Sequence, residues 1–359
     1  MKVALTIKPW WVLPTSTEHT WAPGMVLAQE AADLIAAGHE VVVYAAKGSQ
    51  TAGELVDFDM LPYKEIKQGD IPSIQVSIRE QYYLHEFLRR TIEHLRTNPV
   101  DVLHLHDYRD YPVFKAANLG VPIVATVHGD YYENFTHAPA EILKSFESAN
   151  LISLTKPRKL PAGMTPPVGV VHNTFDAERF KFIEQPKDRL VYVGRITDGK
   201  GSDLAIKVAD GSKSPLDIYG GQFPSTQFEQ EFLRLVKASK YATYHGRLQQ
   251  SEVEPAYDAK AMIFPIREAE GFPLGVLEAL STGTPVITFD VGGMSDIVTD
   301  GVNGFVVPAD DIAAMVVAID KIDQIDRKAC RQSVISRFSP ETVVQKQLAV
   351  FKKVIDQNG

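Results

Sequence analysis

The chain has 359 residues, of which 45% are hydrophobic and 23% charged, with a formal net charge of -8. A chain of this length is too long for one ordinary hydrophobic core, so two domains are expected. The composition is that of a globular rather than a disordered protein. The acidic surplus argues against a nucleic-acid partner, which would favour a basic surface. The one cysteine, Cys330, excludes an intrachain disulfide and a cysteine-built zinc site.

The first half of the chain alternates short apolar runs with helical patterns. Val3 to Ile7 predicts a buried strand, and apolar residues from Leu27 to Ile35 recur at helical spacing before Gly38, which is typical of a helix end. Strands separated by helices imply a parallel sheet with right-handed crossovers. The further predicted strands are 41–46, 100–106, 121–127, 151–155 and 168–172.

The pattern restarts after the polar stretch from Asp176 to Arg189. Strands are predicted at 190–194, 216–219, 242–245, 261–265 and 285–289, with helices near 202–209, 229–238 and 274–280. We therefore expect an amino-terminal domain at 1–172, a linker at 173–189, a second domain at 190–339, and a last amphipathic helix within 340–359. Open parallel sheets bind ligands beyond the carboxyl ends of their strands, so two facing sheets would enclose a ligand cleft.

The amino terminus enters a strand-like run at once, without a charged leader followed by an apolar core. The sequence also holds no apolar stretch of the ~18 residues that a membrane span needs. A cytoplasmic protein is the expectation from these two observations.

The most specific signal is a glycine-bearing loop that opens a helix and is flanked by Glu270 and Glu278. Free N–H groups at a helix start attract anions, and small residues let a phosphate approach the backbone. Glu270 in the loop could reach the hydroxyls of a ligand, and Glu278, about two turns into the helix, could accept from a ribose. The residues between them that open the helix are Gly271, Phe272, Pro273 and Leu274.

This segment, with its continuation to Ile287, resembles the signature of the family 4 (group 1) retaining glycosyltransferases. The resemblance implies an α/β fold of the GT-B type, in which two Rossmann-like doubly wound parallel-sheet domains face each other across a cleft. It further implies that Glu270 contacts the donor sugar and Glu278 the donor ribose. The last helix resembles the one that, in this family, crosses back to the first domain.

Two cations follow the first strand of the second domain. Arg195 comes directly after Gly194, and Lys200 precedes Gly201. Arginine grips a diphosphate as a fork and lysine as a point charge. The family carries a similar arrangement, which places both cations on the donor pyrophosphate.

Two residues of the first domain complete the predicted site. His128 ends a strand, where a side chain that titrates near neutrality could hydrogen-bond the donor sugar or handle the acceptor proton. Gly24 is predicted to open the first helix, where the family has a glycine pair that approaches the donor phosphate. This chain has one glycine there, preceded by Pro23.

The predicted reaction is retaining transfer of a sugar from a nucleoside diphosphate sugar to a hydroxyl of a glycan, a lipid-linked molecule or a small molecule. His128 and Glu270 are the candidate catalytic residues, and neither a cofactor nor a metal is expected. One alternative is a phosphorylase or epimerase on the same fold. Another is a non-catalytic module that binds nucleotide sugars or glycans, because fold alone does not decide activity.

Several further signals point to weaker hypotheses. His104 and His106 share a strand face, but a metal site would need a third ligand that the sequence does not identify. Trp10, Trp11 and Trp21 lie in the loop after the first strand, where they could stack on an acceptor sugar or merely staple the loop. Contact of the basic segment 79–96 with a membrane surface is a further alternative, although its glutamates dilute the positive charge.

Overall fold

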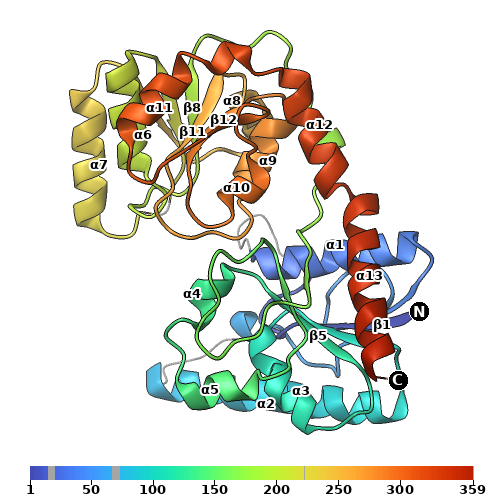
Figure 1. The fold of residues 1–359 in the computed structure, drawn as a ribbon. Helices are drawn as coiled ribbons and strands as arrows, with labels where there is room; N and C mark the ends of the chain where they lie inside the picture. The colour runs from blue at the N-terminus through green and yellow to red at the C-terminus, as the bar shows by residue number, and fades with distance from the viewer. Residues whose placement is uncertain (15–20, 67–72, 222, 359) are drawn as a thin grey trace. The chain divides into compact units, whose positions relative to one another are not determined.

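The computed structural model describes residues 1–14, 21–66, 73–221 and 223–358. They form two compact units, one of Met1–Thr174 with Pro340–Gly359 and the other of Phe175–Ser339. Each unit is built on a parallel sheet covered by helices (Figure 1). The α/β class expected from the alternating pattern is therefore confirmed.

The sheet of unit 1 has seven parallel strands in the order β3-β2-β1-β4-β5-β6-β7. Its strands are β1 (Lys2–Thr6), β2 (Glu40–Tyr44), β3 (Glu54–Val56), β4 (Val102–Leu105), β5 (Ile123–Val127), β6 (Leu151–Ser153) and β7 (Gly169–Val170). Its α-helices are α1 (Ala22–Ala36), α2 (Ser73–Thr97), α3 (Tyr111–Ala116), α4 (Tyr131–Phe135), α5 (Ala140–Ser145) and α13 (Pro340–Asn358). The strand order reverses between β1 and β4, which is where such sheets bind ligands.

Side chains of this sheet alternate between two buried cores, because a parallel sheet is covered on both faces. One core contains Phe87 of α2, and the other contains Phe351 of α13. On β4, Leu103 and Leu105 belong to the first core, whereas Val102 belongs to the second. His104, two residues after Val102, shares its face and therefore lies beneath α1 and α13. A buried imidazole at this position requires polar partners.

The sheet of unit 2 has six parallel strands in the order β10-β9-β8-β11-β12-β13. Its strands are β8 (Leu190–Val193), β9 (Leu216–Tyr219), β10 (Ala242–Gly246), β11 (Ala261–Phe264), β12 (Val286–Phe289) and β13 (Gly304–Val307). Its α-helices are α6 (Ser202–Ser212), α7 (Thr226–Ala238), α8 (Val253–Ala256), α9 (Leu274–Ser281), α10 (Met294–Ile297), α11 (Ile312–Ile319) and α12 (Arg327–Phe338). Here the order reverses between β8 and β11.

The strands predicted from the sequence are all present, with ends shifted by at most two residues. The elements that the sequence pattern did not predict include β3, β13, α11 and α12. The run that forms β13 is too short to show a period, and α12 is polar along much of its length, so neither gave a clear pattern. Among the helices of the described residues, none is long and apolar enough to cross a bilayer.

The carboxyl-terminal helix α13 is part of the core of unit 1. Phe351 and Val354 are fully buried, and α13 contacts α1 directly (Figure 1). We expect Phe351→Ala to lower the free energy of unfolding by about 3–5 kcal/mol, because it removes a buried ring and leaves a cavity.

Urea denaturation would measure this loss. Tyr82→Ala is a matched control, because Tyr82 is an aromatic residue of the same unit that is 71% exposed. Equal losses in the two variants would contradict the position of α13 in the core.

Candidate functional site

The reversal between β8 and β11 gathers charged side chains at one edge of the unit 2 sheet. Arg195 and Lys200 lie in the loop between β8 and α6, and Glu268 and Glu270 lie in the loop between β11 and α9. These two strands are hydrogen-bonded neighbours. The carboxyl ends of neighbouring parallel strands meet at the same edge, so the cations and the acids come together.

Lys200 pairs with both glutamates, and Arg195 pairs with Glu268. Nζ of Lys200 lies 2.9 Å from Oε1 of Glu268 and also contacts Oε2 of Glu270. Arg195 donates to the same Oε1 of Glu268 at 3.2 Å. The side chain of Lys200 is only 7% exposed, whereas that of Arg195 is 54% exposed. A diphosphate placed on these cations would take over contacts that Glu268 makes in this structure.

Lys200 is held at this edge by the turn that starts α6. Gly201, the N-cap of α6, has a φ of +69°, and a Cβ there would lie 1.9 Å from the carbonyl oxygen of Pro265. The absence of a side chain lets the loops after β8 and β11 touch. This close packing keeps Lys200 next to the β11 loop.

The predicted glycine-bearing loop is largely buried. Gly271, Phe272 and Pro273 are buried, and the ring of Phe272 packs 5.3 Å from that of Phe338 between centroids. Pro273 is the N-cap of α9, and Leu274, its first helical residue, is 43% exposed. The loop is thus fixed by packing, with the start of α9 beside it.

Glu278 has a partner that the sequence did not reveal. The hydroxyl of the fully buried Tyr257 donates to Oε2 of Glu278 at 2.8 Å. Burial raises the pKa of Glu278, and the hydrogen bond from Tyr257 opposes that rise. The tyrosine therefore fixes the position of one carboxylate oxygen of Glu278.

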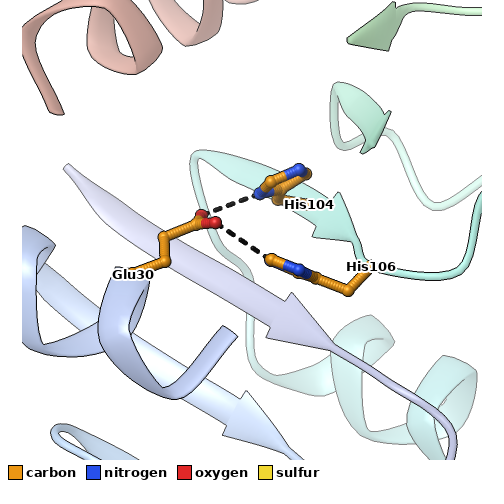
Figure 2. A group of neighbouring side chains, drawn as sticks. All are labelled: Glu30, His104 and His106. Atoms are coloured by element: carbon orange, nitrogen blue, oxygen red, sulfur yellow. Dashed lines mark hydrogen bonds and ion pairs between the residues drawn. The ribbon is translucent and has the colours of Figure 1, made fainter. Parts of the chain in front are cut away.

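In unit 1, Glu30 of α1 contacts two histidines, His104 on β4 and His106 just after this strand. Oε1 of Glu30 lies 2.8 Å from Nδ1 of His104, and Oε2 lies 3.0 Å from Nε2 of His106 (Figure 2). Gln347 of α13 also donates to Oε1 of Glu30 at 2.5 Å. His104 and Gln347 thus hydrogen-bond to Glu30, whereas Nε2 of His106 lies within ion-pair distance of the carboxylate without hydrogen-bond geometry.

The same group reaches the predicted catalytic histidine. Nδ1 of His106 lies 3.1 Å from Nε2 of His128, which follows β5. A cavity of about 20 Å³, enough for about one water molecule, is lined by Glu30 and by His104, His106 and His128. His128 is thus connected through His106 to a buried carboxylate.

Burial controls the charge of these groups. It would raise the pKa of Glu30, but the neighbouring His104 and His106 outweigh it and hold that pKa well below the usual range. Burial lowers the pKa of His106 and lowers that of His128 further, with His106 as an additional cause. At neutral pH the group is therefore one carboxylate facing neutral His106 and His128.

Glu30 supplies the third group that a metal site at His104 and His106 would need. Ligand atoms of the three residues lie within 4.8 Å of one another, and the residue types would suit zinc. However, the contacts of 2.8 and 3.0 Å are shorter than the ~3.3 Å between neighbouring ligands of a tetrahedral zinc with bonds of ~2.05 Å. The distances favour a hydrogen-bonded group over a preformed metal centre.

His128 also lines a second, larger pocket of about 310 Å³ in unit 1. Trp10 and Trp21, whose ring centroids are 5.7 Å apart, form part of its wall. Arg109 and Asn134 add polar groups. Aromatic faces beside a few polar groups suit a sugar ring.

Gly24 has a packing role in the structure. The helix begins at Ala22, two residues before the predicted start, and Gly24 is buried in its first turn. A Cβ at Gly24 would lie 2.8 Å from side-chain atoms of both Leu13 and Trp21. The missing side chain makes room for these neighbours, while contact of Gly24 with a donor phosphate stays a prediction.

Both halves of the chain match glycosyltransferase families. The model for group 1 glycosyl transferases matches residues 174–337, and that for glycosyltransferase family 4 matches residues 24–154. An uncharacterized glycosyltransferase of Methanocaldococcus jannaschii is 22% identical over 91% of this chain and 93% of its own length. A D-inositol 3-phosphate glycosyltransferase of Frankia alni is 26% identical over 80% of this chain and 82% of its own.

Solved structures share the fold along nearly the whole chain. The Anabaena protein HepE, crystallised with UDP-glucose, superposes with a TM-score of 0.67 at 15% identity and covers 98% of this chain and 100% of its own. At this identity the likeness concerns the fold alone.

The buried histidines predict acid sensitivity. Unfolding lets His106 and His128 take up protons near pH 6.5, whereas burial keeps them neutral in the folded state. The unfolded state then binds more protons, so stability should fall as the pH falls below 6.5. We expect His128→Asn to reduce this dependence by up to about 1.4 kcal/mol per pH unit.

Urea denaturation between pH 5 and pH 7.5 would measure the change. His85→Gln, at an exposed histidine of α2, serves as the control and should keep the wild-type dependence. If the free energy of unfolding of His128→Asn changed with pH as that of the wild type does, His128 would be equally protonated in the folded and unfolded states.

Proposed function

The chain belongs to the family 4 (group 1) glycosyltransferases, and we propose that it transfers a sugar from a nucleoside diphosphate sugar to an acceptor hydroxyl with retention of anomeric configuration. In this reaction the bond from the anomeric carbon to the diphosphate oxygen breaks. A bond from that carbon to the acceptor oxygen forms, and the hydroxyl proton is released. The site must therefore stabilise a departing diphosphate and receive a hydroxyl.

The observation that carries the proposal is the cation pair at the switch point of unit 2. Lys200 and Arg195 both contact Glu268 at the end of β8 and β11, the edge at which such sheets bind ligands. Charge builds on the diphosphate as it departs, and fixed cations stabilise that charge. The start of α9 adds backbone N–H groups beside the same loop.

Glu270 and Glu278 orient the donor in this proposal. Glu270 is held by Lys200, so binding of a phosphate to Lys200 would release its carboxylate for the sugar hydroxyls. Glu278, fixed by Tyr257, keeps one oxygen for the ribose. The donor is thereby bound at its sugar, its diphosphate and its ribose by one unit.

The acceptor is proposed to bind in the pocket of unit 1 that His128 and the two tryptophans line. His128 is neutral at pH 7 because burial lowers its pKa. A neutral imidazole can accept a hydrogen bond from the attacking hydroxyl. Trp10 and Trp21 would stack on the apolar face of the acceptor sugar.

The reaction is further proposed to need no divalent metal. Arg195 and Lys200 supply the positive charge that a metal would provide at the diphosphate. Activity that survives dialysis against EDTA would support this, and activity restored only by added Mg²⁺ or Mn²⁺ would refute it.

The first test is donor binding, and UDP sugars come first because the HepE structure holds UDP-glucose. A nucleotide at ~100 times its dissociation constant should stabilise the wild type by ~2.7 kcal/mol. Arg195→Ala should abolish most of that gain while folding normally, because this side chain is half exposed. Thermal unfolding with UDP, GDP, ADP and their sugar conjugates would measure it.

Lys207→Ala is the matched control, since Lys207 is an exposed cation of α6 in the same unit. It should respond to the nucleotide as the wild type does. Turnover is then assayed as release of nucleoside diphosphate with candidate acceptors, and product NMR reports the anomeric configuration. Binding without release of nucleoside diphosphate under any acceptor would favour a non-catalytic nucleotide-sugar module.

The acceptor pocket makes a separate prediction. Trp10→Ala should raise the KM for the acceptor about two- to tenfold, the equivalent of the ~0.5–1.5 kcal/mol of an aromatic contact, and leave donor binding intact. Initial rates at varied acceptor concentration would show this.

Trp11→Ala provides the comparison, because Trp11 is adjacent in sequence but is not among the described residues that line the pocket. The same rise in KM in both variants would argue that the loop, rather than the Trp10 ring, binds the acceptor.

A further inference from the structure

A chain of three side chains runs from the interior of unit 1 to the predicted acceptor pocket. Glu30 contacts His106, and His106 contacts His128. His128 lines both the buried cavity and the larger pocket. Figure 2 shows Glu30 of α1 projecting toward His104 and His106. The charge of Glu30 can therefore influence His128 through His106.

The position of the proton on His106 follows from its contact with Glu30. Nε2 lies 3.0 Å from Oε2, which is ion-pair distance, but the contact does not have the geometry of a hydrogen bond. Oε1 of Glu30 accepts a hydrogen bond from Gln347 and lies 2.8 Å from Nδ1 of His104, which is the environment of an ionised carboxylate. Two atoms that both present lone pairs at this distance would repel, so Nε2 must bear the hydrogen. Burial keeps His106 neutral, which leaves Nδ1 without a hydrogen.

The position of the proton on His128 follows from its contact with His106. Its Nε2 lies 3.1 Å from Nδ1 of His106, within hydrogen-bond distance. Since Nδ1 of His106 is an acceptor, Nε2 of His128 must donate. His128 is neutral as well, so its own Nδ1 carries a lone pair.

We propose that Glu30 is a positioning residue that, through His106, fixes His128 in the Nε2–H form and leaves Nδ1 of His128 as the hydrogen-bond acceptor for the substrate hydroxyl. The tautomer part stands on the contacts of unit 1. The catalytic part rests on the proposed glycosyltransferase function. Glu30 itself touches neither donor nor acceptor in this scheme.

The other neighbours of Glu30 explain why its orientation is fixed. His104 and Gln347 both place nitrogens on Oε1, at 2.8 and 2.5 Å. Nε2 of His104 in turn meets the hydroxyl of Thr126 at 2.8 Å. One carboxylate oxygen is thus occupied by two contacts, and the other is directed at His106.

This asymmetry predicts the effect of Glu30→Gln. The amide oxygen of the glutamine should take the side of His104 and Gln347, where two nitrogens approach it. Its NH₂ then faces Nε2 of His106 and requires a lone pair there. His106 must move its hydrogen to Nδ1 and donate to Nε2 of His128, so His128 becomes the Nδ1–H form. The acceptor nitrogen for the substrate is lost without any change at His128 itself.

Nitrogen-15 NMR of the imidazole rings tests the first step, because protonated and unprotonated ring nitrogens have well-separated shifts. The signals of His128 are assigned by their loss in His128→Gln. We expect the Nε2–H form in the wild type and the Nδ1–H form in Glu30→Gln. Detection of the Nδ1–H form in the wild type would overturn the proposal without any variant, so the test does not depend on Glu30→Gln folding.

Steady-state kinetics test the second step. Glu30→Gln should lower kcat by about 100-fold, the low end of what a positioned acid–base group supplies, with the donor KM roughly unchanged. Glu93→Gln is the matched control, because it makes the same chemical change on α2, where the exposed side chain of Glu93 pairs with Arg89. It should retain wild-type kcat and the wild-type tautomer.

The outcomes separate the two proposals. A changed tautomer with wild-type kcat would refute the positioning role, and equal loss of kcat in Glu93→Gln would reduce it to a structural effect. Absence of turnover with every donor would refute the proposed function, while the tautomer measurement would still be decisive for unit 1. Metal analysis of the purified wild type could also find one equivalent of zinc that is lost in Glu30→Gln. That result would mean that Glu30 and the histidines form a metal centre, and it would overturn the proposal.

Discussion

Parallel strand pairing is the constraint from which the candidate site residues of each unit follow. Each sheet is fully parallel and reverses its order once, between β1 and β4 in unit 1 and between β8 and β11 in unit 2. Parallel pairing puts the carboxyl ends of neighbouring strands at one edge. The loops that follow those strands carry His106 and His128 in unit 1, and Arg195, Lys200 and Glu270 in unit 2. Residues far apart in the sequence become neighbours because of this one feature.

Each unit also keeps its buried charges partnered without a ligand. In unit 2, Lys200 is nearly enclosed between Glu268 and Glu270, since an unpaired ammonium in such a position would be costly. In unit 1, the carboxylate of Glu30 receives contacts from His104, His106 and Gln347. The groups around Lys200 and around Glu30 differ in their exposure to solvent. The ion-pair partners of Lys200 lie beside the half-exposed Arg195, whereas Glu30, His104 and His106 are buried in the core of unit 1.

The sequence identified the residues that follow strands but not the partners that hold them. Lys200 and Glu270 stood out because each lies next to a glycine in a recognisable motif, and the structure brings them into contact. Glu268 had no such signal, because it is one polar residue in a loop. Glu30 appeared as one polar residue in a helix, and its burial depends on α13, more than 300 positions away along the chain. A polar residue at an otherwise apolar helical position was the single available hint.

The sequence alone determined the alternation of strands and helices and the position of most strands, because apolar periodicity is a local property of the chain. It also determined the family, through the segment that begins at Glu270 and its counterparts along the chain. Only the tertiary structure decided which polar atoms meet: Glu30 with His106, Tyr257 with Glu278, and Glu268 with both cations. Those contacts join residues from different elements, and hydrogen bonding and charge pairing depend on distances of about 3 Å that no local pattern encodes.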